Sequence, residues 1–103
     1  MEYNFIWDPA KARRNIKKHG VTFELATAIF YDPMALTIYD DDNSDNDEDR
    51  WVTLGLVNGQ HYLSVIPTYH DQHNNAVTIR LISARLATKH EMKLRITKGD
   101  HHA

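Results

Sequence analysis

The chain has 103 residues, of which 42% are hydrophobic and 25% are charged, and its formal net charge is −2. This length suits a single domain over residues 1–103 with one modest core. The chain contains no cysteine, which excludes disulfides, thiolate nucleophiles and cysteine-bound zinc. No apolar run approaches the roughly 20 residues of a membrane span, and the first residues lack a signal-peptide pattern, so we expect a cytoplasmic protein.

Charged residues are distributed unevenly along the chain. Eleven of the twelve Lys and Arg residues fall in two segments, 8–19 and 80–98. Residues 40–49 instead hold seven acidic residues and no basic one. If the fold brings the two basic segments together, they would form a surface that binds phosphate groups. The acidic segment would then be a loop that points elsewhere, or a docking site for something basic.

The N-terminal segment predicts a short strand over residues 3–7, followed by a helix with clear ends. Asp8 can cap the first turn, and Pro9 suits the first helical position. This helix should run to about Lys18. Gly20 can then adopt the left-handed conformation that closes it.

A second helix and a strand are expected next. Thr22 caps the helix, and hydrophobic residues at helical spacing continue it until Asp32. Residues 35–39 predict a strand. Residues 40–49 are too polar to be buried, which indicates an exposed loop.

A β-hairpin is the strongest local prediction. Residues 51–57 and 60–66 flank Asn58 and Gly59, which are residue types that favour the positive φ angles of a tight hairpin turn. Pro67 lacks a backbone N–H, so we expect it at a strand end or a sheet edge.

The C-terminal part predicts a polar turn over residues 70–75, a strand over 77–84 in the sheet centre, and a last helix. Thr88 and Glu91 form a capping box that opens this helix, which should have about ten residues. The order of elements predicts an α+β fold. In it, an antiparallel sheet carries two N-terminal helices and one C-terminal helix.

Several segments, in their order and spacing, resemble the BrnT toxins. The resemblance extends over about residues 3–95. The segments that carry it are WDPAK (7–11), Asn15, KHGVTFE (18–24), DRW (49–51), RLISAR (80–85), Ala87, Thr88 and Glu91.

This resemblance implies a RelE-like fold and a toxin that inhibits translation by cutting RNA as an endoribonuclease, without a metal or another cofactor. It also implies an RNA substrate and a BrnA-type antitoxin, a ribbon-helix-helix protein that neutralises the toxin in a hetero-oligomer. Two features depart from the family pattern. Residues 40–49 are more acidic than usual, and Arg95 stands where an aromatic residue commonly follows the glutamate.

Metal-free cleavage of RNA needs a base for the 2′-hydroxyl proton, an acid for the leaving 5′-oxygen, and cations near the phosphate. His19 is the first candidate for acid or base, because histidine exchanges protons near neutral pH. Its alternative role is to stabilise the end of the first helix. Lys11, Asn15 and Lys18 share one helix face and are candidates for phosphate binding, with Lys11 also a catalytic candidate. The alternative is a solvated basic face.

Arg80 interrupts an apolar strand, so it needs either a carboxylate partner or a function such as holding the scissile phosphate. Arg85 is the second arginine candidate for catalysis. Strict alternation would place the two on opposite faces, so both can serve one site only if the strand ends or bulges near Ala84. Arg50 and Lys89 are further candidates for phosphate binding, although Arg50 could instead pair with the acidic loop.

Two other functions fit the same residues. A non-catalytic module would use the basic surface to hold RNA or an acidic protein without cutting it. A decayed toxin would be retained only to regulate its operon, and the acidic segment 40–49 is compatible with that function.

Overall fold

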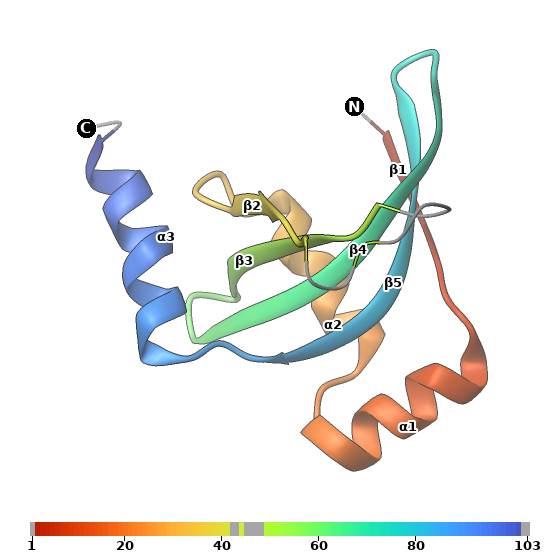
Figure 1. Cartoon of the computed structure of the whole chain (residues 1–103), viewed down its shortest axis with the longest axis horizontal. Coiled ribbons are helices and arrows are strands. Elements are labelled where there is room, and N and C mark those ends of the chain that lie inside the picture. Colours follow the sequence, from red (N-terminus) through yellow and green to blue (C-terminus); the bar gives the residue numbers. More distant parts are fainter. Residues whose placement is uncertain (1, 42–43, 45–48, 102–103) are drawn as a thin grey trace.

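One five-stranded sheet organises the part of the chain that the structure describes (Figure 1). The computed structural model describes residues 2–41, 44 and 49–101, and for residues 71–73 and 98–101 it describes the backbone alone. Most of the predicted acidic loop, 40–49, therefore lies outside the described residues. The elements are β1 (Glu2–Ile6), α1 (Pro9–His19), α2 (Phe23–Ala26), the 3-10 helix η1 (Thr27–Tyr31), β2 (Leu36–Tyr39), β3 (Trp51–Val57), β4 (His61–His73), β5 (Ala76–Leu86) and α3 (Lys89–His101).

The strand order is β1-β5-β4-β3-β2, and the α+β class is confirmed. The sheet is mixed, however, rather than wholly antiparallel as predicted. β1 pairs with β5 in parallel, with Glu2 opposite Ala76, whereas the other neighbouring strands are antiparallel. The direction of β5 is set by its hairpin with β4, and β1 joins the remaining edge from the other end of the chain. Local sequence signals do not report this long-range pairing.

The local signals for helix and hairpin ends are confirmed. The Asp8 carboxylate accepts the Ala10 N–H at 2.8 Å, and Gly20 closes α1 with a φ of 71°. Asn58 and Gly59 have φ angles of 53° and 69°, as a tight hairpin turn requires.

The second hairpin is longer than predicted. β4 continues to His73, so the expected polar turn over residues 70–75 is wrong, and the turn consists of Asn74 and Asn75, with φ angles of 52° and 65°. Pro67 lies inside β4, not at a strand end or sheet edge. It is tolerated because the register of β4 with β5 shifts between Ile66 and Pro67.

One face of the sheet is covered by α1, α2 and η1. The main core lies between these helices and the sheet. Phe23, Ile29 and Ile79 are fully buried in this core. A Cβ on Gly55 would lie 2.7 Å from the Cβ of Ile29, so glycine lets η1 pack directly on β3. Trp7 and Phe30 pack against the core, whereas Trp51 contacts the rings of Tyr39 and Tyr69.

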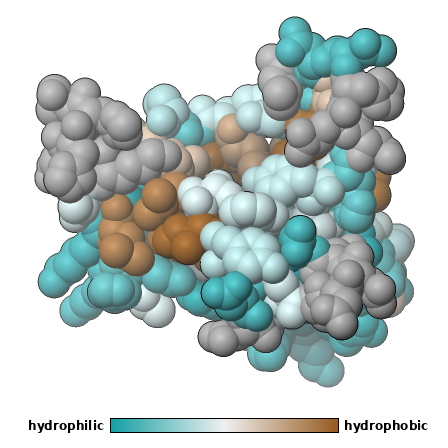
Figure 2. All heavy atoms as spheres, turned by 45° about the horizontal axis from the view of Figure 1, so that its top comes forward, coloured by the Kyte–Doolittle hydropathy of each residue, from teal (hydrophilic) through white to brown (hydrophobic). Residues whose placement is uncertain are grey.

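α3 packs at the β2–β3 end of the sheet, against the other face. Leu54 and Tyr62 alternate with core-facing neighbours and point to this side. The Arg95 guanidinium lies 5.5 Å from the centre of the Tyr62 ring and forms a buried ion pair with Asp32. Arg95, which stands where the resemblance led us to expect an aromatic residue, therefore fixes α3 to the sheet. Figure 2 shows that exposed hydrophobic side chains gather at the end of the molecule where α3 lies.

No helix in the described residues is long and apolar enough to cross a membrane.

Candidate active site

Asn15 fastens α1 to the edge of β5 at the point where β1 has ended. Its amide nitrogen donates to the carbonyls of Ala84 and Val21, at 2.8 and 2.9 Å, and its amide oxygen accepts the Ala84 N–H at 3.0 Å. The side chain thus replaces the backbone of a neighbouring strand. Because Asn15 is only 5% exposed and both amide hydrogens are engaged, it positions the site and leaves no donor for a phosphate.

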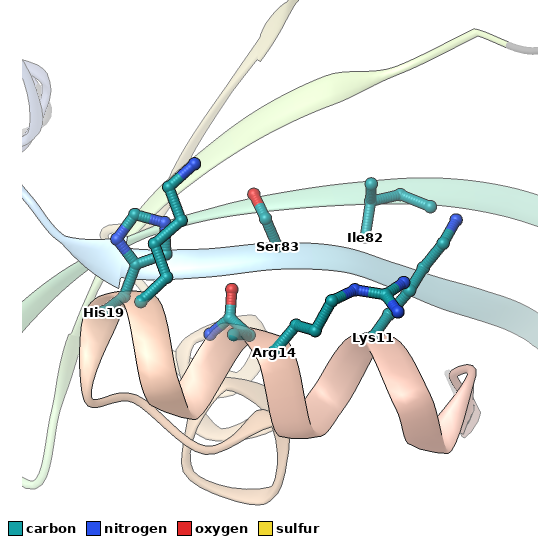
Figure 3. Close-up of a pocket in the computed structure, with 7 residues that line it drawn as sticks. Lys11, Arg14, His19, Ile82 and Ser83 are labelled. Carbon is teal, nitrogen blue, oxygen red and sulfur yellow. The ribbon is translucent and has the colours of Figure 1, made fainter.

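This attachment creates a pocket of about 300 Å³ between α1 and β5 (Figure 3). The α1–β5 pocket is lined by Lys11, Arg14, Asn15, Lys18, His19, Ile82 and Ser83. In the close-up, Lys11 and His19 approach from the helix, and Ile82 and Ser83 project from the strand into the same space.

Helical spacing explains why these cations meet. Lys11, Arg14 and Lys18 are three and four residues apart, so they lie on one face of α1. His19 follows in the last turn beside Gly20. No carboxylate is among the described residues that line the pocket. The pocket therefore favours an anion such as a phosphate, and it holds a group able to exchange a proton.

A β-bulge in β5 brings the two arginine candidates to one face. Ser83 pairs with Ile66 but Leu81 pairs with Pro67, so Ile82 is an extra residue in β5. Alternation restarts after the bulge, and Arg80, Ser83 and Arg85 all face away from the core. The bulge lies two residues before the expected position at Ala84. Arg80 and Arg85 are not among the residues that line the pocket, but they share a strand face with Ser83, which does line it.

Arg85 is held by α3. It binds both carboxylate oxygens of Glu91, at 2.8 and 3.0 Å, and this hydrogen bonding raises the pKa of Arg85, which stays cationic. Burial would raise the pKa of Glu91, but hydrogen bonds from Arg85 and Thr88 lower it overall. Glu91 and Thr88 also exchange the two hydrogen bonds of the predicted capping box. The start of α3 thereby fixes one end of the arginine pair.

The structure does not bring Arg50 or Lys89 into the α1–β5 pocket. Arg50 lies at the start of β3, and its backbone N–H donates to the Ser44 hydroxyl at 2.9 Å. Lys89 is exposed in the first turn of α3, beyond the end of β5. Both positions remain candidates only for contacts with a longer RNA outside the pocket.

Sequence reasoning missed Arg14 and Ser83 as lining residues. The spacing of Arg14 from Lys11 and Lys18 was the available signal, because residues three and four apart share a helix face. Ser83 carried no local signal, since its outward direction depends on the bulge at Ile82. In the described residues, no group of three His, Cys, Asp or Glu side chains lies where it could hold a metal ion.

Together, the fold and the pocket define a small α+β protein with a cationic, histidine-containing pocket. Residues 7–91 match the model of the family described as the ribonuclease toxin BrnT of type II toxin-antitoxin systems. This match covers most of the chain, so the chain belongs to the BrnT family, as the resemblance indicated. The family comprises ribonuclease toxins that are paired with antitoxins.

A solved structure supports the same family. The crystal structure of the Brucella abortus ribonuclease toxin BrnT matches with 26% sequence identity and a TM-score of 0.50. The match covers 86% of this chain and 100% of that chain. A search of curated proteins found no match.

Proposed function

We propose that this protein is a metal-independent endoribonuclease that inhibits translation by cutting RNA at the α1–β5 pocket. The observation that carries the proposal is the convergence of Lys11, Lys18 and His19 on Ser83, with no acidic side chain among the described lining residues. Membership of a family of ribonuclease toxins supports the choice of RNA as the anion.

Cleavage proceeds through the RNA's own 2′-hydroxyl. A base in the pocket takes the 2′-hydroxyl proton, the 2′-oxygen bonds to phosphorus, and the bond from phosphorus to the 5′-oxygen breaks. An acid gives a proton to the leaving 5′-oxygen. The products are a 2′,3′-cyclic phosphate and a 5′-hydroxyl. His19 and Lys11 are the candidates for these two proton transfers, and either residue can be the base with the other as the acid.

Positive charge stabilises the phosphate as negative charge builds on it. Lys18 and Arg14 supply this charge from α1, and Arg80 and Arg85 supply it from β5, on either side of Ser83. Asn15 acts by holding α1 against β5 rather than by touching RNA. Lys89 and Arg50 lie outside the pocket and contact RNA that extends beyond it.

An antitoxin of the BrnA type, a ribbon-helix-helix protein, is the proposed neutralising partner. This assignment rests on the type II toxin-antitoxin family and on the resemblance of the sequence segments. A complex of toxin and antitoxin would keep the pocket from cellular RNA until the antitoxin is lost.

Purified protein without antitoxin tests the activity directly. When it is incubated with a defined RNA in EDTA, we expect shortened RNA carrying 2′,3′-cyclic phosphate ends. Intact RNA, or cleavage that disappears with EDTA, would contradict the metal-independent mechanism.

A matched pair of histidine variants assigns the activity to the pocket. His19→Ala should lower the initial rate by about 10²- to 10⁴-fold, because one proton transfer is lost. His90→Ala changes an exposed histidine on α3, outside the pocket, and should cleave at the wild-type rate. If expression arrests growth and His19→Ala arrests it equally well, a binding module without catalysis explains the toxicity better.

A further inference from the structure

Among the described residues, the outer edge of β2 is an open strand edge. No described strand pairs with it, because β2 ends the order β1-β5-β4-β3-β2. The Asp40 N–H donates to the Arg50 carbonyl at 3.0 Å, so Asp40 faces β3. Residues of an antiparallel strand face the partner strand alternately. Thr37 and Tyr39 therefore present their backbone N–H and C=O groups to the open edge.

Apolar side chains lie beside this edge. Ile38 in β2 is 43% exposed, and Met34 in the preceding turn and Ile96 on α3 are also exposed. The segments that carry them meet, because α3 contacts β2 and because Asp32 accepts hydrogen bonds from both the Met34 N–H and Arg95. The hydrophobic patch in Figure 2 lies at this end of the molecule. We call this region the β2 surface. It consists of the open backbone edge at Thr37 and Tyr39 and the side chains of Met34, Ile38 and Ile96.

The charge beside the β2 surface selects its partner. Asp40 and Asp41 directly follow β2, and the Tyr39 hydroxyl donates to Asp49 at 3.0 Å. These three aspartates belong to the ten-residue segment, 40–49, that contains seven acidic residues and no basic one. This charge repels RNA phosphates, and it also opposes edge-to-edge pairing with a second copy of the chain. A basic protein segment is the complementary occupant.

We propose that the β2 surface binds an extended segment of the antitoxin that carries basic and apolar side chains and adds to the sheet as a sixth strand. The proposal rests on the antitoxin partner assigned under the proposed function. Backbone pairing would come from Thr37 and Tyr39, and apolar contact from Ile38. β2 and β5 are separated by two strands, or about 14 Å across the sheet. The β2 surface is therefore distinct from the α1–β5 pocket.

A lysine at position 38 tests this surface. Ile38→Lys places a cation on the apolar patch and should weaken binding of the antitoxin encoded beside the toxin gene by about tenfold or more. Cleavage of RNA by the same variant should stay at the wild-type rate. The matched control is Ile6→Lys, an isoleucine that is 48% exposed on β1, the edge strand at the opposite side of the sheet. It should bind the antitoxin as the wild type does.

Amide hydrogen exchange distinguishes strand addition from a general charge effect. In the complex, the amide hydrogens of Thr37 and Tyr39 should exchange at least about tenfold more slowly, because they gain hydrogen-bond partners. Unchanged exchange at both amides, together with unchanged affinity of Ile38→Lys, would overturn the proposal while leaving the ribonuclease function intact. A wild-type dimer that Ile38→Lys converts to a monomer would instead make this edge an interface between copies. Failure of the wild type to bind the neighbouring gene's product would overturn the partner assignment, and this site with it.

Discussion

Arg80 and Arg85 lie on the same face of β5, although strict alternation over five residues would separate them. The extra residue Ile82 resets the alternation, so both arginines share a face with Ser83 at the α1–β5 pocket. A bulge thus places two arginines that are five residues apart on one face of the strand, where we propose that they hold a single stretch of RNA.

Arg80→Ala should lower the rate of RNA cleavage by about 10²- to 10³-fold, because a group that stabilises the charged phosphate is removed. Arg80→Lys should recover part of the rate, since it keeps the charge but not the planar fork of donors. Initial rates on one defined RNA measure both effects. Arg13→Ala is the control, because Arg13 is exposed on α1 and, unlike Arg80, does not share the strand face that carries Ser83. Equal rates for Arg80→Ala and Arg13→Ala would remove Arg80 from the mechanism.

Asn15→Ala should destabilise the fold by about 2–4 kcal/mol, because buried backbone groups of Ala84 and Val21 lose their partner. The free energy of unfolding in urea provides the measurement. Lys17→Ala alters an exposed residue of the same helix and should change it by less than about 0.5 kcal/mol. A similarly small loss for Asn15→Ala would show that the Asn15 contacts do not hold α1 to β5.

Arg95→Ala should lower the free energy of unfolding by about 3–5 kcal/mol, because it leaves the Asp32 carboxylate buried without its cation. The two side chains are only 8% and 5% exposed, so solvent cannot replace the pair. Urea unfolding again measures the loss, with exposed Lys93→Ala as the control on α3. A cost below about 1 kcal/mol would place this pair among weak surface ion pairs.

The free energy of unfolding should fall in acid. Burial would raise the pKa of Asp32, but hydrogen bonds from Arg95 and from the Leu56 and Met34 N–H groups lower it overall from its usual value. The pKa of Glu91 is likewise lowered, because hydrogen bonds from Arg85 and Thr88 outweigh the effect of burial. Such carboxyls stabilise the fold fully above their unfolded pKa values, and this stabilisation is lost as the pH falls through the folded values.

Urea unfolding of the wild type and Asp32→Asn, compared from neutral pH to about pH 3, tests this pH dependence. The wild type should lose more stability than Asp32→Asn, which has one depressed carboxyl fewer. Parallel losses in the two proteins would mean that Asp32 does not contribute to the acid sensitivity.

Features set by neighbouring residues were predictable from the sequence. Asp8 and Gly20 end α1 as expected, and Asn58 and Gly59 form the hairpin turn, because each depends on local backbone geometry. The Thr88 capping box is present for the same reason.

Features set by distant contacts were not predictable. The parallel pairing of β1 with β5 joins residues more than seventy positions apart, such as Glu2 and Ala76. Arg95 is buried only because Asp32 and Tyr62 meet it from other elements. For the site, charge and spacing indicated the cations of α1, but the separation of Arg50 from the pocket follows from strand order alone.

Binding of the scissile phosphate of RNA in the α1–β5 pocket can be tested directly. A 2′-O-methyl RNA oligonucleotide lacks the attacking hydroxyl, so it can be bound without being cut, and backbone amide shifts can be followed during its titration. We expect the largest shifts in residues 11–19 and 82–85, around His19 and Ser83. Shifts concentrated in β2 and α3, with none around the pocket, would contradict it.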